Sequence, residues 1–194
     1  MKNHSARTPR FLLAAILSSA VTAALAQGDA GRAAQAFEVV RSVLQHPRCQ
    51  NCHIPGDAPL QLDAGVRHAM NVQRGARGNG ATAMECATCH GTQNLPDSYG
   101  LHVPPGAPAW HLPAPETKMV FIDLSAAQLC AVIKDRRETA GKDLQAMLAH
   151  IRDDKLVGWG WAPGLGRNPV PMPRERFVAA FQEWISLGAP CPPR

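Results

Sequence analysis

Two copies of one pentapeptide constrain this chain more than any other feature. Residues 49–53 read CQNCH and residues 86–90 read CATCH, so both match C-x-x-C-H, the attachment pattern of a c-type haem. In this pattern each sulfur can form a thioether to a haem vinyl group, and the histidine can bind the iron. The expected attachment residues are Cys49, Cys52, Cys86 and Cys89, and the expected proximal iron ligands are His53 and His90.

The short distance between the two motifs limits the architecture. A complete single-haem cytochrome c domain needs more chain than residues 53–85 provide, so we expect both haems to share one fold. Two C-x-x-C pairs can instead bind zinc, or one can act as a thioredoxin-like redox pair. The histidine after each pair and the long gap weigh against zinc, and the lack of strand–helix alternation weighs against thioredoxin.

The first 26 residues have the composition of an export signal. Lys2, Arg7 and Arg10 precede an apolar run that begins at Phe11, and the segment ends in small residues at Ala26. The run is interrupted by polar residues and is short for a membrane span of about 20 residues. We expect a signal peptide cleaved after Ala26 and a periplasmic product without a transmembrane segment; an uncleaved anchor is the alternative.

The remaining chain, residues 27–194, has the length of one domain. Without the leader it carries 17 basic and 15 acidic residues, and no basic run is interleaved with aromatics, so no nucleic acid partner is expected. The stretches 54–83 and 91–115 are rich in Pro and Gly and predict loops. Aromatic residues are few, and two haems would supply the apolar bulk that the side chains lack.

Helical periodicity is clear at both ends of this domain. Apolar residues recur at helical spacing in 32–46, after the N-cap candidate Ser125, in 142–152 and in 174–187, and a short helix is also possible over 64–72. No strand pattern is evident. We therefore predict a mostly α fold, a small cytochrome c-like helical domain whose long Gly/Pro-rich loops wrap around two haems.

The ligand on the other side of each iron decides the chemistry. A methionine there raises the reduction potential, a second histidine lowers it, and an open position permits small-molecule chemistry. The distal candidates are His68, His111, His150 and Met70. For each of them a surface or packing role is the alternative. His46, directly before Pro47, is expected to cap a helix end.

Several other residues have expected roles. Cys130 and Cys191 remain outside the motifs, and in an oxidising compartment they predict a disulfide that ties the last residues to a preceding helix; two free buried thiols are the alternative. Arginines in Gly-rich loops and two tryptophans can pair with haem propionates, although solvated or packed roles are equally compatible. These residues are Arg74, Arg77, Arg167, Trp159 and Trp161.

The chain resembles a secreted dihaem cytochrome c of proteobacteria and is similar to periplasmic proteins labelled isoquinoline 1-oxidoreductase subunit. The stretches that carry the resemblance are HPRC at 46–49, RG at 74–75, WHL at 110–112, LVGWGW at 156–161 and GAPCP at 188–192. The label implies a haem subunit that accepts electrons from a molybdenum hydroxylase-type dehydrogenase. The chain itself contains nothing that resembles a molybdopterin or iron–sulfur site.

These features together predict a periplasmic electron-transfer protein with two covalent haems, which relays electrons to or from a periplasmic oxidoreductase. An electron-transfer subunit is favoured over a catalyst. The alternative is a small dihaem enzyme, peroxidase-like or another haem oxidoreductase, with one open iron position. A ligand or redox sensor is a third possibility, for which the sequence offers no output domain.

Overall fold

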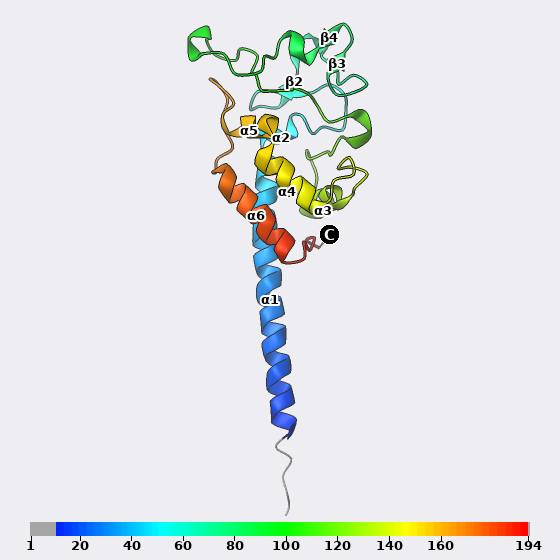
Figure 1. The fold of residues 1–194 in the computed structure, drawn as a ribbon, viewed down its shortest axis with the longest axis vertical. Helices are drawn as coiled ribbons and strands as arrows, with labels where there is room; N and C mark the ends of the chain where they lie inside the picture. Colours follow the sequence, from blue (N-terminus) through cyan, green and yellow to red (C-terminus); the bar gives the residue numbers. More distant parts are fainter. Residues whose placement is uncertain (1–10, 194) are drawn as a thin grey trace, which may run out of the picture.

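The computed structural model describes the backbone of residues 11–193 and the side chains of residues 27–193. The fold is mostly helical, as predicted, with a long first helix that packs chiefly against the last one (Figure 1). The helices are α1 (Phe11–Leu44), α2 (Pro47–Gln50), α3 (Ala126–Lys134), α4 (Leu144–Asp153), α5 (Lys155–Gly158) and α6 (Arg174–Ser186). The strands are β1 (Leu60–Gln61), β2 (Val66–Arg67), β3 (Gly80–Ala81) and β4 (Met84–Glu85).

The expected leader coincides with the beginning of this helical frame. Its residues 1–10 lie outside the described residues, and its residues 11–26 form the first turns of α1. These turns extend beyond the other helices (Figure 1). Within the part of the chain whose side chains are described, residues 27–32 are exposed and the core begins at Ala33.

The core lies where α1 and α6 run side by side. Phe37 and Val40 on α1 face Phe177, Phe181 and Trp184 on α6, and all five side chains are buried. The rings of Phe37 and Trp184 lie 5.1 Å apart between centroids. Burying each large apolar side chain contributes roughly 2 kcal/mol, so this contact stabilises the frame that carries the loops.

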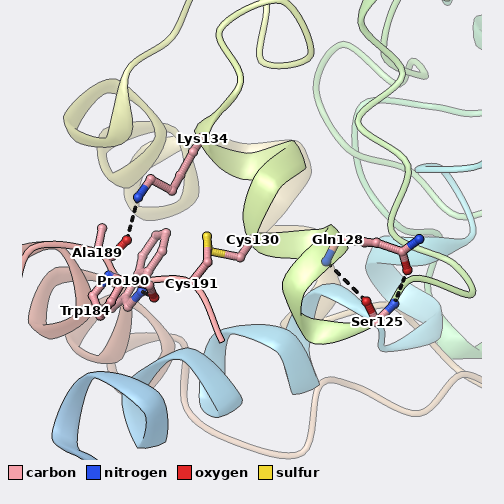
Figure 2. The surroundings of a disulfide bond; sticks show 8 residues. All are labelled: Ser125, Gln128, Cys130, Lys134, Trp184, Ala189, Pro190 and Cys191. Atoms are coloured by element: carbon pink, nitrogen blue, oxygen red, sulfur yellow. Dashed lines mark hydrogen bonds between the residues drawn. A yellow bond between two sulfur atoms is a disulfide. The ribbon is translucent and has the colours of Figure 1, made fainter. Parts of the chain in front are cut away.

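Local signals explain where the helices begin and end. Ser125 accepts a hydrogen bond from the backbone N–H of Gln128, whose side chain accepts one from the backbone of Ser125, and this capping box starts α3 (Figure 2). Asp143 caps α4 by a single bond, in which its side chain accepts from the backbone N–H of Ala146. Gly188, with φ +87°, follows the end of α6. The helices predicted in 32–46, after Ser125, in 142–152 and in 174–187 are confirmed.

The C-terminal segment is tied to α3 as predicted. Cys130 and Cys191 form a disulfide with their Cα atoms 5.6 Å apart (Figure 2). Two further bonds hold the same segment: Lys134 Nζ donates to Ala189 O at 2.6 Å, and Trp184 Nε1 donates to Pro190 O at 2.9 Å. The last residues therefore close the helical frame.

Between α2 and α3 lies the loop half of the protein, residues 51–124, which contains the two small antiparallel hairpins β1–β2 and β3–β4. The helix considered for 64–72 is not formed, because this stretch is β2 followed by a 3₁₀ turn, Ala69–Asn71. Strands of two residues are too short for an alternating pattern, so periodicity could not reveal them. Within the described residues, no helix has the length and apolarity needed to cross a membrane.

The disulfide gives a first testable prediction. Replacing Cys130 and Cys191 together with Ala should lower the free energy of unfolding by about 4 kcal/mol, because the bond closes a long loop in the unfolded chain. Urea unfolding monitored by circular dichroism measures the change. With reductant present, wild type and variant should unfold at nearly the same urea concentration; a difference that persists under reductant would contradict the assignment.

Candidate functional site

Both C-x-x-C-H motifs fold into the same single turn. In each motif the first cysteine carbonyl accepts hydrogen bonds from the backbone N–H groups of the second cysteine and of the histidine. The distances are 3.2 Å from Cys52 and 3.3 Å from His53 to Cys49 O, and 3.2 Å from Cys89 and 2.9 Å from His90 to Cys86 O. A shared local conformation therefore accompanies the shared sequence, and each turn groups two thiols with one imidazole.

The histidine ring of each motif is oriented by a backbone carbonyl. His53 Nδ1 donates to Met119 O at 2.9 Å, and His90 Nδ1 donates to Pro105 O at 2.7 Å. A hydrogen bond of this kind fixes the tautomer in which Nε2 carries the free lone pair, and it holds the ring for metal binding. In both motif histidines Nε2 is thus the ring nitrogen left with a free lone pair.

An aromatic ring stacks on each of these imidazoles. Phe121 lies parallel to His53 with the ring centroids 4.0 Å apart, and Trp110 lies parallel to His90 at 4.4 Å. Trp159 meets Trp110 edge-on at 4.9 Å. The orientation of each ring is therefore fixed twice, by a hydrogen bond and by packing. No packing role for Trp110 was expected from the sequence, and the structure supplies one.

A cavity of about 270 Å³ lies between the two motifs. Its wall includes Cys52 from the first motif and Cys86, Cys89 and His90 from the second. Three of the four distal candidates, His68, Met70 and His111, also line it. Leucine and proline side chains make up much of the remaining wall, so the space suits a large apolar group held near both motifs.

The loop hairpins place two of these cavity residues. His68 directly follows β2, and its N–H donates to Pro59 O at 2.9 Å, which extends the β1–β2 ladder by one bond. Cys86 directly follows β4, and its N–H donates to Asn79 O at 2.8 Å. Gly80 has φ +97°, and a Cβ there would lie 2.6 Å from Met84 O, so the second hairpin requires glycine.

The distal candidates differ in how they are placed. His68 is half-buried, its Nδ1 donates to Ala69 O at 2.9 Å, and its ring centroid lies 6.1 Å from that of His90. His111 is exposed, with Nδ1 2.5 Å from Ala109 O. Met70 is 70% exposed, which leaves most of its side chain in solvent.

His150 belongs to another part of the site. It lies on α4 with its Nδ1 3.4 Å from Asp154 Oδ2, and it is not part of the cavity wall. Its charge is among the influences that lower the pKa of His53, after burial, so it lies on the side of the first motif. The structure thus places His68 near the second motif and His150 near the first.

Burial governs the protonation of the first motif. It raises the pKa of Cys49 to about 12 and that of Cys52 to about 11; a neighbouring thiol adds to each rise, and nearby arginines oppose it. Burial also lowers the pKa of His53 to about 4, against the hydrogen bond to Met119. At neutral pH the motif therefore holds neutral thiols and a neutral imidazole. A neutral imidazole can bind metal, and an uncharged thioether sulfur can be buried without the penalty that a thiolate incurs.

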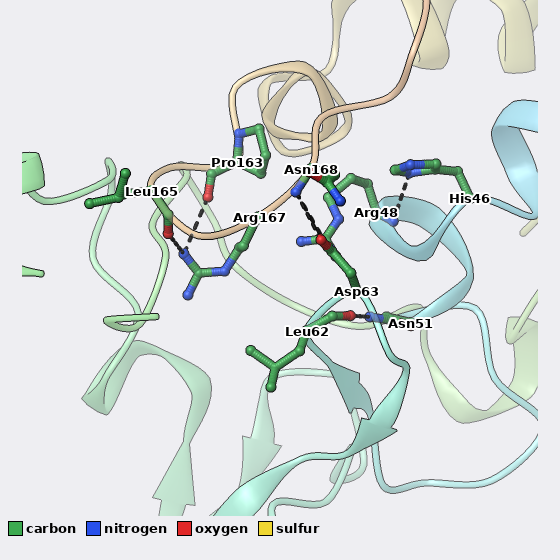
Figure 3. Close-up of polar contacts among 9 residues, drawn as sticks. All are labelled: His46, Arg48, Asn51, Leu62, Asp63, Pro163, Leu165, Arg167 and Asn168. Carbon is green, nitrogen blue, oxygen red and sulfur yellow. Dashed lines mark hydrogen bonds and ion pairs between the residues drawn. The ribbon is translucent and has the colours of Figure 1, made fainter. Parts of the chain in front are cut away.

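Arg48, next to the first motif, is the most informative residue that the sequence analysis did not select. Its side chain is 2% exposed and lines the cavity, and Nη2 lies 2.5 Å from Asp63 Oδ1 (Figure 3). Its guanidinium also lies 5.6 Å from the centroid of the Trp159 ring. Among the described residues no partner is found for its buried Nε. An unsatisfied cationic donor beside an apolar cavity fits the carboxylate of a haem propionate.

Asp63 connects this arginine to a distant loop. Its carboxylate also accepts from the backbone N–H of Asn168 at 3.1 Å (Figure 3). His46, expected to cap a helix end, does so for the helix that follows: its Nδ1 accepts from Arg48 N at 3.3 Å at the start of α2. The chain around the first motif is thus held by polar contacts on both sides.

The other residues considered for propionates have different partners. Arg74 is fully buried and donates to the carbonyls of Ile54, Gly56 and Pro113, so it organises the loop half. Arg167 lines the cavity while donating to loop carbonyls, including that of Val103. The indole nitrogens of Trp159 and Trp161 already donate to Asn94 Oδ1 and Met172 O. Of this group only Arg167 borders the cavity with its charged side chain.

The arrangement fits haem better than zinc. Among the described residues no three His, Cys, Asp or Glu side chains gather closely enough to bind a metal ion by themselves. The paired turns, the oriented Nε2 atoms, the apolar cavity and the unsatisfied Arg48 Nε instead suit a group that brings its own equatorial ligands. Comparison with known protein families, curated proteins and solved structures yields no match to this chain.

The ion pair at Arg48 gives a second prediction. Asp63→Asn should lower the free energy of unfolding by about 2 kcal/mol, because a buried guanidinium loses its charged partner. Asp57→Asn is the matched control: Asp57 is more exposed, and its partner Arg74 keeps several carbonyl acceptors, so the loss of unfolding free energy should be clearly smaller. Urea unfolding of the two variants measures both values, and equal losses would contradict this role of Asp63.

Proposed function

We propose that this protein is an exported, periplasmic electron-transfer protein that carries two covalently attached c-type haems in one domain and relays electrons to or from a periplasmic oxidoreductase. The observation that carries the proposal is the repeated geometry of the motifs. Both C-x-x-C-H sequences form the same turn, and both histidines direct Nδ1 to a backbone carbonyl, so that each Nε2 is available to iron.

Different residues attach each haem, bind its iron and pair with its propionates. The four motif cysteines hold the two haems through thioether bonds, and His53 and His90 are the proximal ligands. Arg48 and Arg167 supply positive charge at the edge of the cavity for propionates. Phe121 and Trp110 keep the ligand rings from turning. When bound, each haem supplies an iron that gains and loses one electron.

An electron carrier needs a site that changes little between its oxidation states. The ligand rings here are each fixed by a short hydrogen bond and by a stacked aromatic ring, which resists reorganisation. His150 is the candidate for the distal side of the first haem, because its charge is among the influences that lower the pKa of His53. As the partner we propose a molybdenum hydroxylase-type dehydrogenase, which the resemblance described above suggests.

Haem stoichiometry tests this proposal. The protein is produced with its leader in a bacterium that performs c-type cytochrome maturation, and the periplasmic fraction is purified. Its intact mass should equal that of residues 27–194 plus two haems, and the pyridine haemochrome spectrum should give two haems per chain. A product without haem, or with zinc in its place, would refute the proposal.

Paired variants assign each haem to its motif. Cys49→Ala/Cys52→Ala and Cys86→Ala/Cys89→Ala should each retain one covalent haem, since one motif remains intact in each case. Cys130→Ala/Cys191→Ala is the control that removes two cysteines without removing a haem. Denaturing electrophoresis with haem staining, together with intact mass, measures the number of covalent haems in each of the three variants. Loss of haem from the control alone would contradict the assignment.

A further inference from the structure

A histidine outside the second motif, His68, lies close to His90 in the wall of the cavity. His90 presents its ring from the 3₁₀ turn Cys86–Thr88 and the residues that follow it, and His68 presents its ring from the end of β2. Both residues line the same cavity. Their ring centroids are 6.1 Å apart, and their planes are inclined by 61°. His68 follows the first hairpin and His90 lies in the turn after the second, so the tertiary structure brings the two rings together.

This separation is the one that two imidazoles on a single metal require. A metal–imidazole bond is about 2 Å long, and the ring centre lies about 1 Å beyond the nitrogen, so two imidazoles on opposite sides of one metal have centroids roughly 6 Å apart. The inclination of the planes is not restricted, because each ring can rotate about its own metal–nitrogen bond. The observed 6.1 Å between the ring centroids matches this separation.

The hydrogen bonds of the two rings point to the same role. His90 Nδ1 donates to Pro105 O at 2.7 Å, and His68 Nδ1 donates to Ala69 O at 2.9 Å. Among the described residues neither Nε2 has a hydrogen-bond partner. Both hydrogen bonds place the proton on Nδ1 and leave Nε2 with a free lone pair, as a metal ligand requires.

The backbone after His68 is held in an unusual conformation. Met70 has φ +60° and Asn71 has φ +52°, two consecutive left-handed residues without glycine. Asn71 Oδ1 accepts hydrogen bonds from Arg67 at 2.7 Å and from Gln73 at 3.1 Å, which stabilises this turn. The turn reverses the chain directly after His68, and the side chain of Met70 within it is 70% exposed.

We infer that His68 is the distal ligand of the haem attached through Cys86 and Cys89, so that this iron is bound by His90 and His68. The inference rests on the proposed function, since it requires a haem on the second motif. It goes further in assigning that haem as six-coordinate and closed to small molecules. An open iron position, if the protein has one, then belongs to the first haem alone.

His68→Ala tests the ligand. The purified variant should still contain two haems per chain, but one ferric haem should change from low to high spin in electron paramagnetic resonance. Its reduced form should bind one more equivalent of carbon monoxide than wild type. Added imidazole should restore the low-spin signal, an effect that a merely structural role of His68 would not produce. His102→Ala, at another histidine of the cavity wall, is the matched control and should leave the spectra unchanged.

His68→Met guards against loss of haem in the alanine variant. Replacing a histidine ligand with a methionine should keep the haem low-spin and raise one of the two reduction potentials in a redox titration. His102→Met should raise neither. An unchanged His68→Ala spectrum with two haems present, or an opening of the site by Met70→Ala instead, would overturn the inference. A protein with no haem on the second motif would instead refute the proposed function.

Discussion

The site depends on two hydrogen bonds between ring nitrogens and backbone carbonyls. The C-x-x-C-H turn brings thiols and imidazole together, but it leaves the imidazole free to rotate about its side-chain bonds. Met119 O and Pro105 O remove that freedom for His53 and His90. Both acceptors lie outside the motifs, 66 residues from His53 and 15 residues from His90, so the geometry of each motif is completed by tertiary structure.

The hydrophobic core and the cavity lie in different parts of the fold. The helices α1, α3, α4 and α6 form a core closed by a disulfide, whereas the cavity and both motifs belong mainly to α2 and the loop half. Loops carry little apolar surface of their own, and here buried Arg74 satisfies several loop carbonyls that helices and strands would otherwise satisfy. A rigid helical frame thus carries a binding region that is rich in irregular backbone.

Much of the helical frame could be predicted from sequence, because amphipathic spacing and caps such as Ser125 are local signals. The disulfide followed from counting cysteines. The placement of the candidate ligands could not be predicted in this way. His68 reaches His90 through a two-residue strand and a left-handed turn, neither of which leaves a periodic pattern. The roles of Arg48 and Trp110 could not be predicted either. Their partners, Asp63 and His90, stand at no regular spacing from them in the sequence.

The stack of rings beside the cavity has a consequence for local opening. His90 stacks on Trp110, Trp110 meets Trp159, and Trp159 lies under the guanidinium of Arg48 beside the first motif. Four separate segments of the chain are therefore linked by consecutive contacts. Movement of any one segment would break its contact with a neighbouring segment. In native-state hydrogen exchange, the amides around both motifs should open with one common free energy, as a single cooperative unit, although long loops usually fluctuate independently.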